Sequence, residues 1–189
     1  VDRTVRREAH ANVETNTFDI EAQKRQQFST IHDVVSGIGY RWNRDTVEAS
    51  EVVAINPSHD TYHLINAFIQ DEISLTDDLK LIVGSKIEYN SFSGVEIQPS
   101  ARALWHVSNS NTLWTAASRA VRTPSRAGVG VSLNRAVTPG APPIQPRILG
   151  DKDVESEELI ALEIGLKSRL SRAFNLDIAT FYNIYDKLV

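Results

Sequence analysis

The alternation of apolar and polar residues with a period of two is the feature of this 189-residue sequence that most constrains its fold. Successive side chains of a β-strand point to opposite faces, whereas a helix would mix the two sets. From position 78 the chain reads DLKLIVGSKIEYN. One face of a strand here would carry Leu79, Leu81, Val83, Ile87 and Tyr89, and the other would carry Lys80, Gly84, Lys86, Glu88 and Asn90. This segment is therefore predicted to be a strand with one apolar face.

The segment 157–167 shows the same period, although its Leu, Glu and Ala content would also suit a helix. Its apolar set is Ile160, Leu162, Ile164 and Leu166, and its other set includes Glu163, Gly165 and Lys167. After a short turn the chain alternates again through FNLDIATFYNIY. Two alternating runs joined by a turn are typical of a hairpin, so both segments are predicted to be strands.

Across the chain the pattern predicts eight strands, at about 14–28, 33–45, 60–75, 79–91, 96–107, 111–121, 157–169 and 173–186. The connections alternate in kind. Tight polar turns are expected at 29–32, 76–78, 108–110 and 170–172, and the connections 46–59, 92–95 and 122–156 are generally longer, although the middle one is short. Alternation of this kind predicts an antiparallel up-and-down meander of all-β class, with turns at one rim and loops at the other.

The aromatic residues lie toward the ends of the predicted strands, apart from Phe68, which lies in the middle of its strand. The loop rim receives Tyr40, Trp42, Tyr62, Tyr89, Phe92, Tyr182 and Tyr185, and the turn rim receives Phe28, Trp105, Trp114 and Phe174. Two aromatic girdles around an aliphatic band fit the preference of such rings for membrane interfaces. The alternative interpretation is the general β-propensity of aromatic residues.

The faces opposite the apolar sets are polar, and include Gln98, Ser100, Arg102 and Asp177. Such a face would be the solvent face of a soluble sandwich or the hydrated lumen of a large barrel, and periodicity does not separate the two. Runs of ten to fifteen residues exceed the five or six residues of an ordinary strand, which favours the barrel.

Composition excludes several classes of function. A net charge of -4 and a pI of about 5.7 argue against a dedicated nucleic-acid-binding protein. The absence of cysteine excludes disulfides, cysteine-based zinc sites and a catalytic thiol. No run of eighteen apolar residues forms a membrane-spanning helix, although strands of a barrel would escape that criterion. The N-terminus has no initiator Met and no apolar signal core, and both ends look cut, so a fragment of a longer protein is expected.

Motifs for catalysis or metal binding are weak. His59 and His63 are four residues apart but enter a strand and lack the glutamate of a metalloprotease motif, so solvated loop histidines are expected. Gly128 and Gly130 form a bare GxG without the context of a nucleotide site. We therefore expect no catalytic residue, no metal site, no cofactor and no enzyme activity.

Three longer segments carry a family resemblance. They are AFIQDEISLTDDLKLIVGSKIEYN at 67–90, IQPSARALWHVSNSNTLWTAASRAVRTPSR at 97–126, and ESEELIALEIGLKSRLSRAFNLDIATFYNIYDKLV at 155–189. In order, spacing and turns they resemble the barrel of TonB-dependent outer-membrane receptors. The match covers nearly all of 60–189, and 14–45 fits less specifically.

The resemblance implies a barrel of about twenty-two antiparallel strands with an N-terminal plug. Receptors of this family import scarce nutrients, most commonly ferric siderophores, across the outer membrane of Gram-negative bacteria, with energy supplied through TonB. Residues 1–189 would then be part of such a barrel, without the plug and the TonB box. The expected partners are outer-membrane lipid and a nutrient ligand, with TonB engaged only through the absent N-terminal part. The short turns would be periplasmic, and the loops and segment 1–13 extracellular.

Arginines are concentrated where the sixth predicted strand meets the longest loop. Anion capture is one interpretation, because a guanidinium is a suitable partner for the carboxylates of a ferric chelate. Arg126, Arg135 and Arg147 are the ligand-binding candidates in that loop. The other interpretation is pairing with a carboxylate on a neighbouring strand, with Glu163 as a candidate for Arg119 or Arg122. The resemblance favours this interpretation, so Arg102, Arg119, Arg122 and Glu163 are predicted to be scaffold residues of the rim and lumen.

Two alternatives to a TonB-dependent receptor stay open from the sequence. One is a soluble all-β binding module, of the carbohydrate-binding type. The other is a passive porin-like channel.

Overall fold

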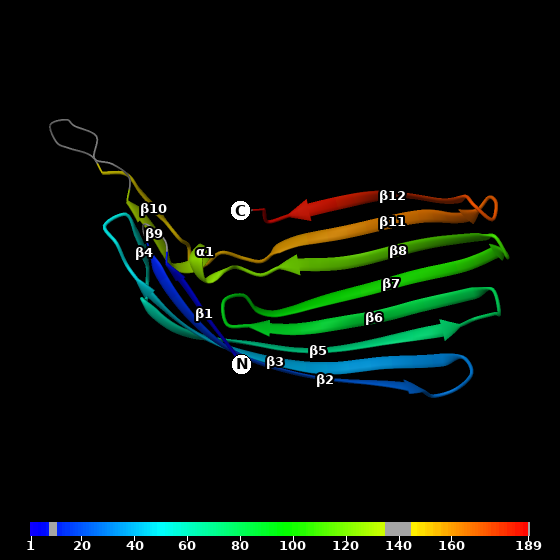
Figure 1. Ribbon diagram of the computed structural model, residues 1–189, viewed down its shortest axis with the longest axis horizontal. Coiled ribbons are helices and arrows are strands. Elements are labelled where there is room, and N and C mark those ends of the chain that lie inside the picture. The colour runs from blue at the N-terminus through cyan, green and yellow to red at the C-terminus, as the bar shows by residue number, and fades with distance from the viewer. Residues whose placement is uncertain (8–10, 135–144, 189) are drawn as a thin grey trace.

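The computed structural model describes residues 1–7, 11–134 and 145–188. Its main element is a nine-stranded antiparallel sheet in the order β1-β2-β3-β5-β6-β7-β8-β11-β12 (Figure 1). The strands are β1 Asp2–Arg7, β2 Asn12–Gln27, β3 His32–Glu48, β5 His59–Ser74, β6 Leu79–Asn90, β7 Gly94–Ser108, β8 Asn111–Arg122, β11 Glu157–Arg169 and β12 Asn175–Asp186. Every strand in this order pairs with its neighbours in the sheet, which is an up-and-down meander.

All eight predicted strands are present, with ends within three residues of the predicted ones. The prediction was wrong for segment 1–13, which was assigned no strand. β1 pairs with the first part of β2, from Asp2 opposite Thr17 to Arg7 opposite Asn12. The sequence of β1, DRTVRR, is polar on both faces and therefore gives no period-two signal.

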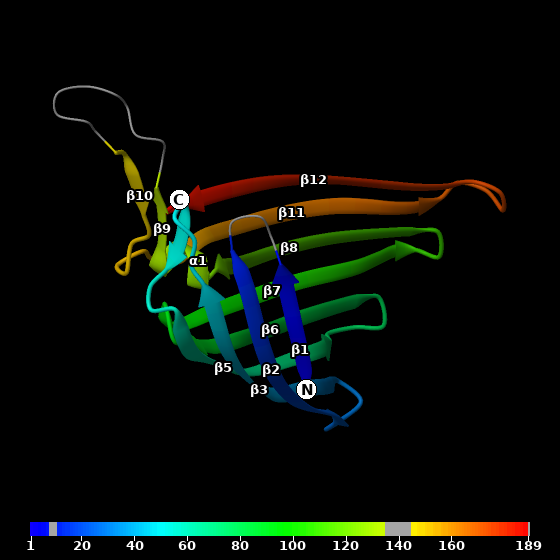
Figure 2. The same cartoon turned by 60° about the vertical axis from the view of Figure 1, so that its left-hand side comes forward.

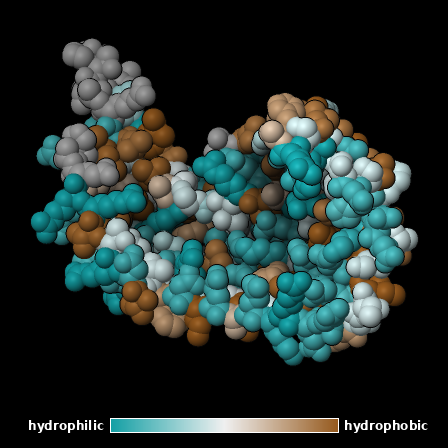
Figure 3. Space-filling model, turned by 45° about the vertical axis from the view of Figure 1, so that its right-hand side comes forward, coloured by the Kyte–Doolittle hydropathy of each residue, from teal (hydrophilic) through white to brown (hydrophobic). Residues whose placement is uncertain are grey.

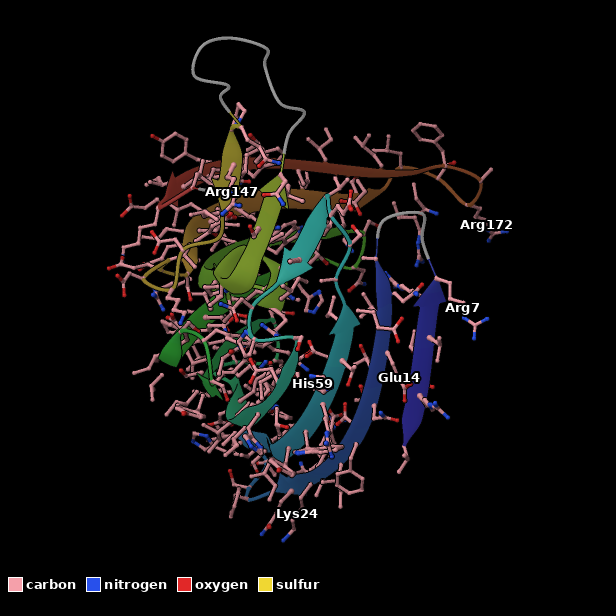
Figure 4. All side chains as sticks on the ribbon, turned by 90° about the vertical axis from the view of Figure 1, so that its left-hand side faces the viewer. Arg7, Glu14, Lys24, His59, Arg147 and Arg172 are labelled. Carbon is pink, nitrogen blue, oxygen red and sulfur yellow. The ribbon has the colours of Figure 1, made fainter. Side chains whose placement is uncertain are left out.

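The nine strands trace an open arc around a hollow, with the two free edges at β1 and β12 (Figures 2 and 4). We call the end with the connections 28–31, 75–78, 109–110 and 170–174 the turn end, and the opposite end the loop end. At the turn end, side-chain hydroxyls close the short connections; Ser29 Oγ, for example, accepts from the backbone N–H groups of Ile31 and His32 at 3.1 Å each. The turn end therefore holds little more than tight turns.

The loop end carries a second, three-stranded sheet in the order β10-β9-β4. It is formed by β4 Val53–Ile55, β9 Val131–Asn134 and β10 Arg147–Leu149, and the short helix α1 Arg126–Gly130 precedes β9. The connections 46–59 and 122–156, predicted as separate loops, thus share one sheet. Among the described residues no helix has the length and apolar character needed to cross a membrane.

The two faces of the large sheet differ in polarity. Cross-strand partners share a face, so Ile87 lies beside Ile97 on one face and Glu88 beside Glu96 on the other. The apolar face, here the outer face, exposes large side chains that include Ile38, Ile65, Ile87, Ile97, Ile160, Leu162 and Ile164. The polar face, here the inner face, lines the hollow, where hydrophilic side chains predominate (Figure 3).

The described residues contain almost no apolar core. Val47 and Ala161 are the buried hydrophobic residues. In a soluble sandwich a second sheet would cover the apolar face, and none covers it within the described ranges. The sheet therefore has the polarity of a barrel wall whose apolar side faces outward.

The aromatic prediction is right for part of the set. Tyr40, Trp42, Tyr89 and Tyr182 lie on the outer face toward the loop end, and Trp105 lies on the outer face toward the turn end. Tyr62, Trp114 and Tyr185 lie toward the predicted ends but are opposite Asn43, Gly165 and Leu159 on the inner face, so the girdle interpretation is wrong for them. A shift of one residue along a strand changes the face, and the rim assignment ignored that parity.

Candidate functional site

Arg126 of α1 is the most buried cation at the loop end. Its side chain is 9% exposed and that of Asp45 is 5% exposed. Arg126 Nε donates to Asp45 at 3.3 and 3.1 Å and lies 3.5 Å from Asp60 Oδ2. Arg126 Nη2 donates to the backbone carbonyl of Pro57. We call Arg126, Asp45 and Asp60 the loop clasp.

The loop clasp joins segments that are far apart in sequence. Asp45 of β3 and Asp60 of β5 are cross-strand partners on the inner face, so their carboxylates would repel each other without a cation. Arg126 supplies that cation from the longest loop. Ligand contact by Arg126 stays a prediction, and its guanidinium is here buried and engaged by protein oxygens.

Backbone contacts reinforce the same junction. The N–H of Asn56 donates to the carbonyl of Gly130 at 2.8 Å, and the N–H of Asn134 donates to the carbonyl of Val52 at 2.8 Å. A Cβ at Gly130 would lie 2.5 Å from the Asn56 carbonyl oxygen, so a residue without a side chain is needed there. The two long connections are thus held together by the small sheet, the loop clasp and this close approach.

Arg119 of β8 bridges three strands near the loop end. The β7–β8 ladder runs as far as Ser100 opposite Ser118, and Arg119 follows directly. Its guanidinium donates to the carbonyl of Ile97 and lies 3.4 Å from Glu96 and 3.1 Å from Glu158. Its donors therefore continue the contact between β7 and β8 where the backbone ladder stops.

Arg119 and Arg122 do pair with carboxylates of neighbouring strands, as predicted, but the carboxylates are not that of Glu163. Arg122 pairs with its cross-strand neighbour Glu157 at 3.2 Å. Arg119 pairs with Glu96 and Glu158, and neither arginine contacts Glu163. Glu163 lies opposite Ala116, three register positions from Arg119 along β8, which is too far for direct pairing.

Lys187 extends this network beyond the end of β12. Its Nζ lies 2.8 Å from Glu155 and 3.1 Å from Glu158. Hydrogen bonds to these two carboxylates, Glu155 first, raise the pKa of the Lys187 ammonium. Glu158 is therefore shared by Lys187 and Arg119.

The other predicted site residues are dispersed. Arg102 lies on the inner face opposite Ile82 and Ala116. Arg147 is exposed on β10 opposite Asn134, in the small sheet (Figure 4). Arg135 lies outside the described residues, as do Pro139, Pro142 and Pro143 of the same loop. Of the three predicted ligand-binding arginines, the two that the structure describes, Arg126 and Arg147, lie on different elements and share no ion-pair partner.

A shallow groove of about 260 Å³ hollows the inner face over β2, β3, β5 and β6. Its charged lining residues are Asp19, Glu21, Arg41, Lys86 and Glu88. Arg41 bonds Asp19, and Lys86 lies 2.5 Å from Glu88. The wall is thus hydrated and of mixed charge, and its cations are matched by carboxylates.

The carboxylate partners were missed in the sequence. Asp45 and Asp60 were not singled out, because their contact with Arg126 spans 81 and 66 residues along the chain. Glu158 could have been predicted as a partner from the sequence, since the predicted strands 111–121 and 157–169 already place it near the end of β8. Within the described residues, no group of three or more histidine, aspartate or glutamate side chains is arranged to hold a metal ion.

Comparisons with known proteins agree with this architecture. The family described as TonB dependent receptor-like, beta-barrel, matches residues 2–189. No match was found among curated proteins.

Three solved structures illustrate the shared fold. The siderophore receptor PirA from Acinetobacter baumannii is 18% identical, with a TM-score of 0.70 over 93% of this chain and 27% of that chain. PirA from Pseudomonas aeruginosa is 15% identical, with a TM-score of 0.74 over 97% and 34%. A mutant of the ferric enterobactin receptor PfeA from Pseudomonas aeruginosa, in complex with enterobactin, is 15% identical, with a TM-score of 0.69 over 93% and 27%.

The chain spans about a quarter to a third of the length of these receptors. Its open arc of antiparallel strands, apolar outside and polar inside, corresponds to a portion of their barrels. The family match extends over almost every residue of the sequence. The chain belongs to the TonB-dependent receptor family, in the β-barrel part.

Proposed function

We propose that this chain forms part of the wall of an outer-membrane receptor that binds and imports a scarce nutrient, a ferric siderophore being the leading ligand. The observation that carries the proposal is the polarity of the nine-stranded sheet. Strands of 12–17 residues pair side by side with large apolar side chains exposed outward and polar side chains lining a hollow, except for the short edge strand β1. That arrangement suits a wall between lipid and a hydrated lumen.

The ligand class rests on the related structures. Two of them are named as siderophore receptors, and a third contains enterobactin. In this chain the exposed Arg147 remains a candidate ligand contact, whereas the engaged guanidinium of Arg126 favours a bracing role. Energy would come through TonB, engaged by an N-terminal part of the full-length receptor. The pairing of Arg119 and Arg122 with glutamates supports the scaffold role proposed for them.

Location can be tested by fractionating cells that express a full-length receptor containing this chain. We expect the receptor in the outer-membrane fraction, extractable only with detergent. Recovery of a monodisperse protein without detergent would instead support a soluble binding module.

Transport can be tested with radiolabelled ferric siderophores of catecholate and hydroxamate type. We expect accumulation of one class in cells, abolished by an uncoupler of the inner-membrane proton gradient and by deletion of TonB. Accumulation that continues with the uncoupler would support a passive porin-like channel. A matched strain with the receptor gene deleted provides the background.

A further inference from the structure

An apolar groove crosses the outer face of β2, β3, β5 and β6 and reaches β7. Its volume is about 450 Å³. Ala22 and Ala67 give it depth, and its walls are larger side chains, namely Ile20, Ile38, Tyr40, Ile65, Ile87, Tyr89 and Val95. No described segment of the chain covers it, and its apolar lining suits a flexible hydrocarbon chain.

An aromatic row follows the groove toward the loop end. Phe18, Trp42 and His63 are cross-strand partners on β2, β3 and β5. His63 Nδ1 lies 3.0 Å from Tyr40 Oη, and the two rings stack with centroids 6.0 Å apart. Aromatic rings with a polar edge favour the boundary between hydrocarbon and headgroups.

Two arginines occupy the next row. Arg3, Asn16 and Arg44 are cross-strand partners on β1, β2 and β3, and Thr61 of β5 is opposite Arg44. Arg44 is four residues beyond Tyr40 on the same face, or roughly 13 Å along the strand. Arg3 donates its Nε to Glu14 at 2.9 Å. Within the described ranges, Arg44 and the terminal nitrogens of Arg3 have no ion-pair or hydrogen-bond partner.

From the groove and the two rows we propose that this patch binds one phosphorylated acyl lipid of the surrounding membrane. The acyl chain lies in the apolar groove and the phosphate is bound by Arg44 and Arg3. This inference rests on the proposed location in the outer membrane, because the ligand is a component of that membrane.

Charge complementarity distinguishes this patch from the rest of the outer face. At the loop end of β8 and just beyond β12, the cations Arg119 and Lys187 are engaged by Glu96, Glu155 and Glu158. Over β1 to β3 the outer face carries Arg3, Arg7 and Arg44, with Glu14, which bonds Arg3, and Glu48, which accepts from Asn12. Within the described ranges Arg44 therefore stands above the apolar groove without an ion-pair partner. A phosphate supplies the missing anion, and an arginine is well suited to it.

The head-group arm of the test uses the full-length receptor, purified in detergent and stripped of lipid. Native mass spectrometry then measures retention of phosphatidylglycerol and of diacylglycerol with the same chains. We expect the wild type to retain phosphatidylglycerol preferentially. The double variant Arg3→Gln, Arg44→Gln should lose roughly tenfold in that retention, the effect of one charge-assisted contact. Arg102→Gln on the inner face is the matched control and should retain the lipid.

The acyl arm fills the groove. Ala67→Phe, on the groove floor, should reduce retention of both lipids, whereas Ala103→Phe, on the outer face of β7 outside the groove, should not. Heat-dependent gel mobility identifies the variants that keep a folded barrel.

The outcomes separate the two proposals. Equal retention by the double arginine variant and its control, in a receptor recovered from the outer membrane, overturns the lipid site and leaves the proposed function intact. Equal lipid retention by Ala67→Phe and Ala103→Phe likewise overturns the lipid site and leaves the proposed function intact. Recovery of the receptor without detergent overturns the proposed function and the lipid site together.

Discussion

The inner and outer faces of the nine-stranded sheet come from alternate residues of the same strands, yet they are stabilised differently. On the inner face, cations such as Lys86 and Arg122 pair with carboxylates, and aromatic rings lie over glycines, such as Trp114 over Gly165. The outer face exposes aliphatic side chains that no other described part of the chain covers. The difference shows that the inner face is self-sufficient in water, whereas the outer face needs an apolar environment. Four experiments test this contrast.

The largest effect is expected at the loop clasp, where the inner face is most buried. Arg126→Ala leaves Asp45 and Asp60 opposite each other without a cation, and removing one partner of a buried pair costs about 3–5 kcal/mol. We expect faster amide hydrogen exchange in β9 and β4 of the full-length receptor. Exchange unchanged from the wild type would show that the small sheet alone holds the loops.

The second effect compares neighbouring positions on β7 that face opposite sides. Ala101→Arg places a charge on the outer face, at a cost of about 2–4 kcal/mol near the bilayer midplane. Ser100→Arg places the same side chain on the inner face and should cost little. The free energy of unfolding from lipid bilayers in urea measures both variants. Equal costs would contradict the assignment of the faces.

The third effect concerns close packing on the inner face. A Cβ at Gly165 would lie 2.5 Å from the ring of Trp114, so Gly165→Ala should displace that ring at a cost of about 1–3 kcal/mol. Gly128→Ala is the matched control, since its Cβ would meet only Ser125 Oγ at 3.5 Å. Unfolding followed by tryptophan fluorescence reports on both. A similar stability for the two variants would mean that Trp114 adapts freely.

The smallest effect is expected at the exposed ion pair of the inner face. The side chain of Arg122 is 81% exposed, and such pairs contribute about 0–1 kcal/mol. Arg122→Gln should therefore leave the unfolding midpoint within error of the wild type. A loss comparable with that of Arg126→Ala would indicate that Arg122 braces the loop end in the same manner.

Much of the large sheet could be predicted from the sequence, because alternation over ten or more residues leaves little freedom. Strands such as β6 and β11 were predicted nearly to their ends. The short strands β4, β9 and β10 have three or four residues each and carry no measurable period. β1 was missed because both of its faces are polar.

The candidate site was less predictable than the fold. The concentration of arginines after β8 was visible, and the pairing of Arg119 and Arg122 with carboxylates was anticipated in kind. The burial of Arg126 was not, because it depends on Asp45 and Asp60, which approach it only after β3, β5 and the longest loop have come together.

The sequence by itself determined the family, the strands and the division into an apolar and a polar face, since all three are properties of local pattern and order. Only the tertiary structure decided which charges meet, which aromatic rings face inward, and where arginines stand above an apolar groove. Those relations depend on strand register and on contacts between segments tens of residues apart, and no local pattern encodes them.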